Sequence, residues 1–134
     1  MFIAGLSKEQ QEKFLNLAYT MVYADGRLDE REQLLFTGYS VEVDPSIDMT
    51  QVHAVDYAET LAAFDECSVA DKQKIFFELY AIALVDESYP ESEKVLVELA
   101  KERFQISDDK MAAMRAAFEN FCDAYKKLVK VVVE

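Results

Sequence analysis

The chain repeats one capped, amphipathic pattern at an offset of 61 residues. Sliding the sequence by that offset places Ser7 on Ser68 and Asp25 on Asp86. Helix caps, apolar stripe and acidic turn coincide in register, and chance rarely aligns all three. We therefore predict two similar helical hairpins, over residues 7–39 and 68–104, that pack face to face while the remaining helices close a bundle. Other matching pairs are Lys13 with Lys74, Tyr19 with Tyr80, Glu32 with Glu93, and Leu35 with Leu96.

Helical spacing of apolar residues and helix-capping signals run through the whole sequence. Ser7 is a good N-cap for a first helix, with Gln10 at the capping-box position, and Asp25-Gly26 ends that helix. The resulting fold class is all-α, a bundle of about six to seven helices. The helices are expected over residues 8–24, 29–39, 50–64, 69–85 and 90–104, with a last one from residue 108.

The last helix has two features of its own. Its apolar side chains fall on one side, which favours burial in the core over an exposed groove for a partner. Its β-branched tail, residues 129–133, has weak helix propensity, so we expect the tail to fray or to pack extended. The apolar side consists of Met111, Met114, Phe118, Phe121, Tyr125 and Leu128.

Length and composition indicate one soluble domain over residues 1–134. The sequence is 51% hydrophobic, with only 3 Gly and 2 Pro, so it can bury a core and does not resemble a turn-rich β protein or a disordered chain. Cys67 and Cys122 form no metal-binding pattern, which indicates reduced thiols. Residues 1–6 lack a basic leader, and residues 128–133 are too few to span a bilayer. We expect a cytoplasmic protein.

The chain is strongly acidic. It has 26 acidic and 14 basic residues, a formal net charge of −12. This charge repels phosphate backbones, which makes nucleic acid an unsuitable partner. Cations, basic protein surfaces or neutral partners suit it better, although the acidity also serves solubility alone. The sequence leaves the oligomeric state open.

Two acidic turns follow from the repeat. The first contains Asp25, Asp29 and Glu32, and the second contains Asp86 and Glu93. Acids in a first helical turn are explained by capping and by the helix dipole. Asp25 and Asp86 instead end their helices, where a negative charge opposes the dipole.

Three explanations for Asp25 and Asp86 remain open at this point. Each could accept hydrogen bonds from amides of its own turn, or it could reach the start of the next helix. Each could also join Glu32 or Glu93 around a divalent cation such as Ca²⁺ or Mg²⁺, which prefer carboxylate oxygens. The candidate metal ligands are Asp25, Asp29, Glu32, Asp86 and Glu93. An EF-hand is excluded, because the ligand positions counted from Asp25 are occupied by Arg27, Arg31 and Phe36.

The segment AYTMVYADGRLDEREQLLF resembles the signature of the TerB-like (tellurite-resistance protein B) domain family. The segment ELYAIALVDESYPESEKVLVELAKERF is similar to the second copy of that signature, and the resemblance spans residues 7–106. It implies a pseudo-twofold helical bundle that binds a metal ion through the same acidic residues. It also implies a role in resistance to tellurite and other chemical stress. The second copy departs from the pattern, since Glu87 replaces the Gly and Pro90 stands where Asp29 stood.

The sequence therefore favours a non-catalytic binding or scaffold domain over an enzyme. In one hypothesis a divalent cation in the acidic turns supports the interaction with another protein. In the alternative, the chain is a metal-independent helical module for protein–protein interaction. No glycine-rich phosphate loop or hydrolase motif is present to support catalysis.

Overall fold

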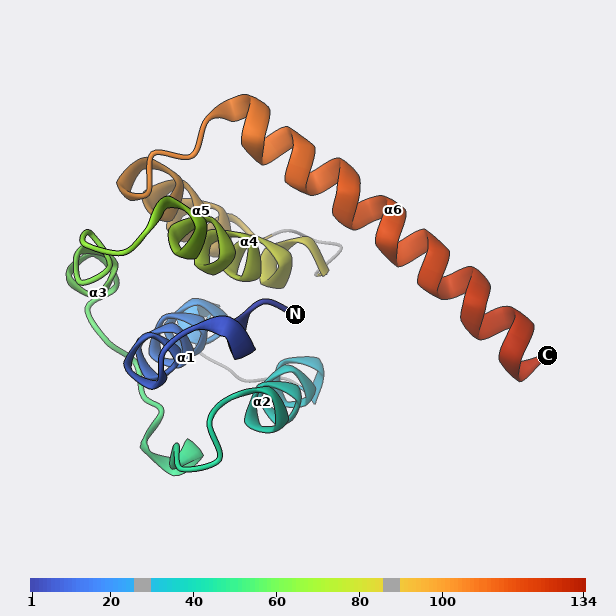
Figure 1. Cartoon of the computed structure of the whole chain (residues 1–134), viewed down its shortest axis with the longest axis horizontal. Coiled ribbons are helices and arrows are strands. Elements are labelled where there is room, and N and C mark those ends of the chain that lie inside the picture. Colours follow the sequence, from blue (N-terminus) through green and yellow to red (C-terminus); the bar gives the residue numbers. More distant parts are fainter. Residues whose placement is uncertain (26–29, 86–89) are drawn as a thin grey trace. The chain divides into compact units, whose positions relative to one another are not determined.

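The computed structural model describes residues 1–25, 30–85 and 90–134, with only the backbone of 25 and 30–32, and these residues are all-helical without strands (Figure 1). The chain forms two compact units, Met1–Phe104 and Gln105–Glu134. Helix α6 (Asp108–Val133) makes up most of the second unit. The first unit contains η1 (Ile3–Gly5), α1 (Lys8–Val22), η2 (Tyr23–Asp25), α2 (Glu30–Glu42), η3 (Met49–Gln51), α3 (Tyr57–Ala62), α4 (Val69–Val85) and α5 (Glu91–Arg103).

The helix boundaries in the first unit repeat at the sequence offset. A shift of 61 residues moves the first residue of α1, Lys8, onto the first residue of α4, Val69. The same shift carries both ends of α2 onto both ends of α5. Hydroxyl caps repeat as well, since the Ser7 and Ser68 side chains accept hydrogen bonds from the amides of Gln10 and Asp71. Each cap satisfies one backbone donor that a helix start leaves open.

The core lies where α1 and α4 pack together. α5 contacts both of these helices, and α3 contacts α1 and α5. Equivalent positions of the two copies are buried together, and full burial of such side chains contributes about 1.5–3 kcal/mol each. The buried pairs are Phe14 with Ile75, Leu15 with Phe76, Ala18 with Leu79, Met21 with Ile82, and Val22 with Ala83.

One pair of equivalent residues makes direct contact. The Gln10 side-chain amide donates to the Asp71 carboxylate at 3.3 Å, and the two residues are 61 apart in sequence. Each occupies the third position of its own helix. Equivalent side chains approach one another only near a local twofold axis, so this contact supports pseudo-twofold pairing of the starts of α1 and α4.

The predicted helix over residues 50–64 is wrong in its first half. Residues 49–51 form η3, residues 52–56 are not helical, with Val52 and Asp56 extended, and only α3 is α-helical. The amides of His53 and Val55 bond to the side chains of Asn16 and Thr20 on α1. These bonds give the segment partners outside a helix, and Asp56 then caps α3 through the amide of Glu59.

The expectation for the end of α6 is also wrong. The helix continues to Val133, so residues 129–133 are helical rather than extended. α6 belongs to a unit of its own, so the core role expected for its apolar side stays a prediction. Among the residues that the structure describes, no helix is both long and apolar enough to cross a membrane.

Gln11 is a buried polar side chain that joins three segments. Its amide group donates to the carbonyls of Ile3 and Leu6 in the N-terminal segment, at 3.0 and 3.3 Å. Its carbonyl oxygen accepts from the amide of Asp44, beyond α2, at 2.8 Å. A single α1 side chain therefore satisfies backbone groups in the segment before α1 and in the turn after α2.

Replacing Gln11 with Leu should lower the free energy of unfolding by about 1–3 kcal/mol, because buried backbone groups would lose their partners. Urea unfolding followed by circular dichroism measures the change. The exposed neighbour Glu12 gives a matched control, since Glu12→Leu should alter stability by less than about 0.5 kcal/mol. Equal effects of the two substitutions would contradict the role of Gln11.

The N-terminal segment is held between α2 and α4 by two carboxylates. The Met1 amino group lies 2.8 Å from Glu42 Oε1 and 3.0 Å from Glu78 Oε1. The amides of Phe2 and Ile3 donate to the same two oxygens. The Glu78 side chain is only 8% exposed, so the amino group and the amides supply the donors that a buried carboxylate needs.

This arrangement makes stability depend on pH. Burial by itself lowers the pKa of the Met1 amino group, but hydrogen bonds and charges from Glu42 and Glu78 outweigh it and raise the pKa above 8.0. A group with a raised folded-state pKa stabilises fully below its unfolded-state pKa. That stabilisation is lost as the pH rises through the folded-state value.

We predict that Glu78→Gln lowers stability at neutral pH and reduces the stability lost between pH 7 and the alkaline range. Urea unfolding across this pH interval, on protein with a free amino group at Met1, tests both effects. Glu98→Gln, which removes the same charge from an exposed site on α5, should keep the wild-type pH dependence. A wild-type pH profile in Glu78→Gln would refute the contribution of the amino group.

Candidate functional site

Most of the predicted metal ligands cannot be placed as side chains. Asp29 and Asp86 lie outside the described residues. Asp25 ends η2 and Glu32 lies in the first turn of α2, and for both the description covers only the backbone. Glu93 is described fully, and only 5% of it is exposed in the first turn of α5.

The described backbone brings the end of the first hairpin's leading helix close to α5. η2, which ends at Asp25, packs against α5, which carries Glu93. A carboxylate as buried as that of Glu93 requires compensating groups. Within the described side chains, no group of three or more His, Cys, Asp or Glu residues is arranged to hold a metal ion. The metal-site hypothesis therefore stays a prediction.

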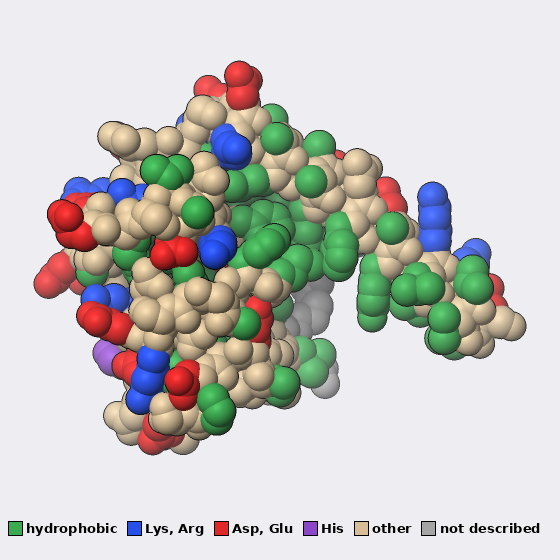
Figure 2. Space-filling model, viewed as in Figure 1, with side chains coloured by type: hydrophobic (Ala, Val, Ile, Leu, Met, Phe, Trp, Pro, Cys, Tyr) green, Lys and Arg blue, Asp and Glu red, His purple; other side chains and the backbone are tan. Residues whose placement is uncertain are grey.

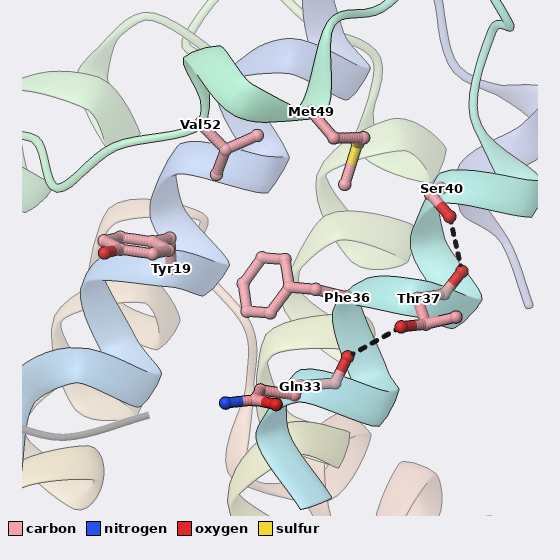
Figure 3. A pocket seen from close by; sticks show the side chains of 7 residues that line it. All are labelled: Tyr19, Gln33, Phe36, Thr37, Ser40, Met49 and Val52. Carbon is pink, nitrogen blue, oxygen red and sulfur yellow. Dashed lines mark hydrogen bonds between the residues drawn. The ribbon is translucent and has the colours of Figure 1, made fainter. Parts of the chain in front are cut away.

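The sequence did not indicate a second feature, an open cleft between α1, α2 and η3. Figure 3 shows the residues that line it. Its volume is about 350 Å³. Tyr19 of α1, Phe36 of α2, and Met49 and Val52 around η3 give it mostly apolar walls. Gln33, Thr37 and Ser40 form the α2 side. A concave apolar surface with a few polar groups at its edge is typical of binding sites.

The polar residues of the cleft are partly used within their own helix. The Thr37 hydroxyl donates to the Gln33 carbonyl, and the Ser40 hydroxyl donates to the Thr37 carbonyl at 2.6 Å (Figure 3). These bonds direct the hydroxyl hydrogens toward the backbone of α2. The cleft therefore presents mainly ring faces, a thioether and an isopropyl group to an incoming ligand.

An aromatic row fixes the positions of the two ring walls. Tyr19 contacts Phe36 edge-on with ring centroids 5.9 Å apart, and Phe36 contacts Tyr39 at 5.7 Å. Tyr39 then contacts Phe14 in the core, while Tyr23 stacks on Tyr19 at the outer end. Such pairs contribute about 0.5–1.5 kcal/mol beyond area burial, so the row joins the cleft to the core.

The inner end of this row is uncharged. Burial raises the pKa of the Tyr39 phenol well above its ordinary value, and the nearby charges of Glu78 and Glu42 raise it further. Tyr39 therefore stays neutral at physiological pH and acts as a packing residue. Of the rings in this row, Tyr19 and Phe36 line the cleft.

The opposite wall of the cleft is set by the non-helical segment after η3. Asn16 and Thr20 of α1 bond to the amides of His53 and Val55, at 3.1 and 2.9 Å. These bonds hold Val52 opposite α2. The cleft exists because this segment is not helical, which is the feature that the predicted helix over residues 50–64 missed.

The residues of the second copy that correspond to the two ring walls are buried. The 61-residue shift moves Tyr19 onto Tyr80 and Phe36 onto Val97, which are 4% and 0% exposed, whereas Tyr19 and Phe36 themselves are half-buried. α3 packs against α5 in that copy. The corresponding face of α2 lies opposite the η3 segment, and the cleft lies between them.

No family profile, curated protein or solved structure matches this chain.

Proposed function

We propose that the chain is a non-catalytic binding module that receives an apolar side chain of a partner protein in the cleft between α1 and α2. The observation that carries this proposal is the open, aromatic-walled cleft in the first copy, whereas the equivalent residues of the second copy, Tyr80 and Val97, are buried. The walls come from four apolar residues on three elements, and the aromatic row keeps them in place.

The charge of the first unit indicates the charge of the partner segment that carries the apolar side chain. Residues 105–134 contain five acidic and five basic side chains, so the whole net charge of −12 belongs to residues 1–104. A cationic segment is attracted by such a surface and an anionic one is repelled. The proposed ligand is therefore a basic peptide with one large apolar or aromatic anchor residue.

A peptide series tests this function directly. Lysine-flanked peptides that differ only in a central Ala, Leu or Phe should bind with affinity rising in that order, because the anchor buries more apolar area. Two-dimensional NMR should show saturable shifts centred on Tyr19, Phe36 and Met49. Equal shifts with the Ala and Phe peptides would count against an anchor site.

The internal repeat provides a matched control. Thr37→Trp should fill the cleft and weaken binding of the Phe peptide at least about tenfold, since the anchor loses its burial. Glu98→Trp adds the same ring at the equivalent position of the second copy. Because this substitution also removes a charge, it is compared with Glu98→Gln, and the two variants should bind the Phe peptide with equal affinity. Unaltered affinity in Thr37→Trp would overturn the assignment of the cleft.

A second proposed function is divalent-cation binding by the acidic turns. The packing of η2 against α5 supports it, because this contact brings the backbone of Asp25 near the helix that carries the buried Glu93. The resemblance to the TerB-like family supports the same ligands and a role in tellurite or other chemical-stress resistance. Ca²⁺ or Mg²⁺ would be held by oxygens from both hairpins.

A titration of divalent ions followed by melting temperature tests this second function. Millimolar Ca²⁺ or Mg²⁺ should raise the melting temperature, since a ligand that binds only the folded state stabilises it. Asp25→Asn combined with Glu32→Gln should abolish the gain. Glu9→Gln with Glu12→Gln changes the charge equally on α1 and should preserve it. No gain with any of several divalent ions would eliminate this function.

A further inference from the structure

The negative charge of the chain is concentrated in the segment that forms two walls of the cleft. Residues 32–71 contain nine acidic residues and neither Lys nor Arg, a net of −9 within the total of −12. Figure 2 shows acidic side chains at the bottom of the view, where Figure 1 shows the residues of η3. Part of this charge therefore lies beside the cleft. The nine are Glu32, Glu42, Asp44, Asp48, Asp56, Glu59, Asp65, Glu66 and Asp71.

Four of these acids are matched by cations from elsewhere in the fold. Three of them form ion pairs, and the fourth lies in the field of a lysine. Because their charge is already balanced within the molecule, they are poor candidates for binding a cation of a partner. They are Glu42 with the Met1 amino group, Asp65 with Arg103, Asp71 with Lys74, and Asp44 near Lys8.

Asp48 is different, because it lies next to the cleft and, in the described part of the chain, takes part in no ion pair. It directly precedes Met49, which forms one of the apolar walls. The hydroxyl and the amide of Thr50 donate to Asp48 Oδ1 at 2.6 and 3.0 Å. A carboxylate has about four acceptor sites, so these two bonds leave capacity for a cation.

The bonds from Thr50 also prepare the carboxylate of Asp48 for a ligand. They lower its pKa, first through the hydroxyl and then through the amide, so the side chain is ionised at neutral pH. They also hold the carboxylate in one orientation, which reduces the entropy lost when a partner binds. A fixed, charged acceptor is thus present at the edge of an apolar cleft.

We propose that Asp48 selects a lysine or arginine next to the anchor residue of the segment bound in the cleft. This inference rests on the proposed binding of a basic peptide and adds one specific contact to it. The field of an acidic chain attracts any cationic segment, whereas one oriented carboxylate distinguishes where the cation lies along the segment. Neighbouring residues are about 3.8 Å apart, so a cation beside the anchor can reach a carboxylate beside the wall residue Met49.

Two isomeric peptides test this contact at constant charge. Both contain one central Phe and two lysines, which adjoin the Phe in one isomer and stand at the two ends in the other. Titration calorimetry should show about two- to fivefold tighter binding of the adjacent isomer, the range expected for an exposed ion pair. Equal affinities would contradict the selection, while binding of both isomers that Thr37→Trp blocks would still support the cleft.

Asp48→Asn tests the residue itself. Asparagine keeps an oxygen that accepts the bonds from Thr50, so the cap of η3 persists and only the charge is lost. The variant should bind the adjacent isomer about two- to fivefold more weakly and the other isomer as the wild type does. Glu66→Gln removes the same charge from an exposed site between α3 and α4, and should affect both isomers equally.

Two results would overturn the role of Asp48 in different ways. An equal loss for both isomers in Asp48→Asn would leave general attraction as the only effect of its charge, and the cleft would stand as the binding site. No binding of either isomer to the wild type would instead overturn the cleft, and this inference with it. Circular dichroism checks that each variant keeps the fold of the wild type.

Discussion

The structure of the first unit depends on the polar side chains of α1, which bind backbone groups of segments outside the helices. Gln11 satisfies the N-terminal segment and the turn after α2. Asn16 and Thr20 satisfy the non-helical segment before α3. Buried backbone groups without partners are costly, so each of these loops has one favourable position against α1. The apolar side of the same helix meets α4 in the core, and α1 therefore organises both the core and the connections.

Much of this fold could be predicted because the signals are local. The start of α1 follows from Ser7 and Gln10, and the 61-residue offset places α4 and α5. The segment before α3 could not be predicted, because its partners lie on α1, more than 30 residues away in sequence. The tail of α6 was misjudged for a different reason. Its valines have weak intrinsic propensity, but they continue a helix that is already nucleated, where adding each residue is far easier than starting a new turn.

In the candidate sites too, features set by neighbouring residues could be predicted and features set by distant residues could not. The acidic residues were visible in the sequence because capping, turn and repeat are patterns of neighbouring residues. The cleft was not visible, since Tyr19, Phe36 and Val52 come from three separate elements. The role of Glu78 was also hidden, because its partners are the N-terminal residues some 76 positions away. Residue patterns therefore identified candidate chemistry, whereas the cleft and the partly buried ion pairs of Met1 emerged only from tertiary packing.

The helices of the two hairpins begin and end at equivalent residues, but different segments pack against them. This difference in packing indicates which hairpin can bind a partner. In the second copy α3 packs against α5, and Tyr80 and Val97 are buried. In the first copy the equivalent rings line the cleft opposite the η3 segment. A fold built from two similar hairpins needs only one of them fully covered to secure its core. The other can leave part of its apolar face open, so the same repeat supplies stability from one copy and a recognition surface from the other.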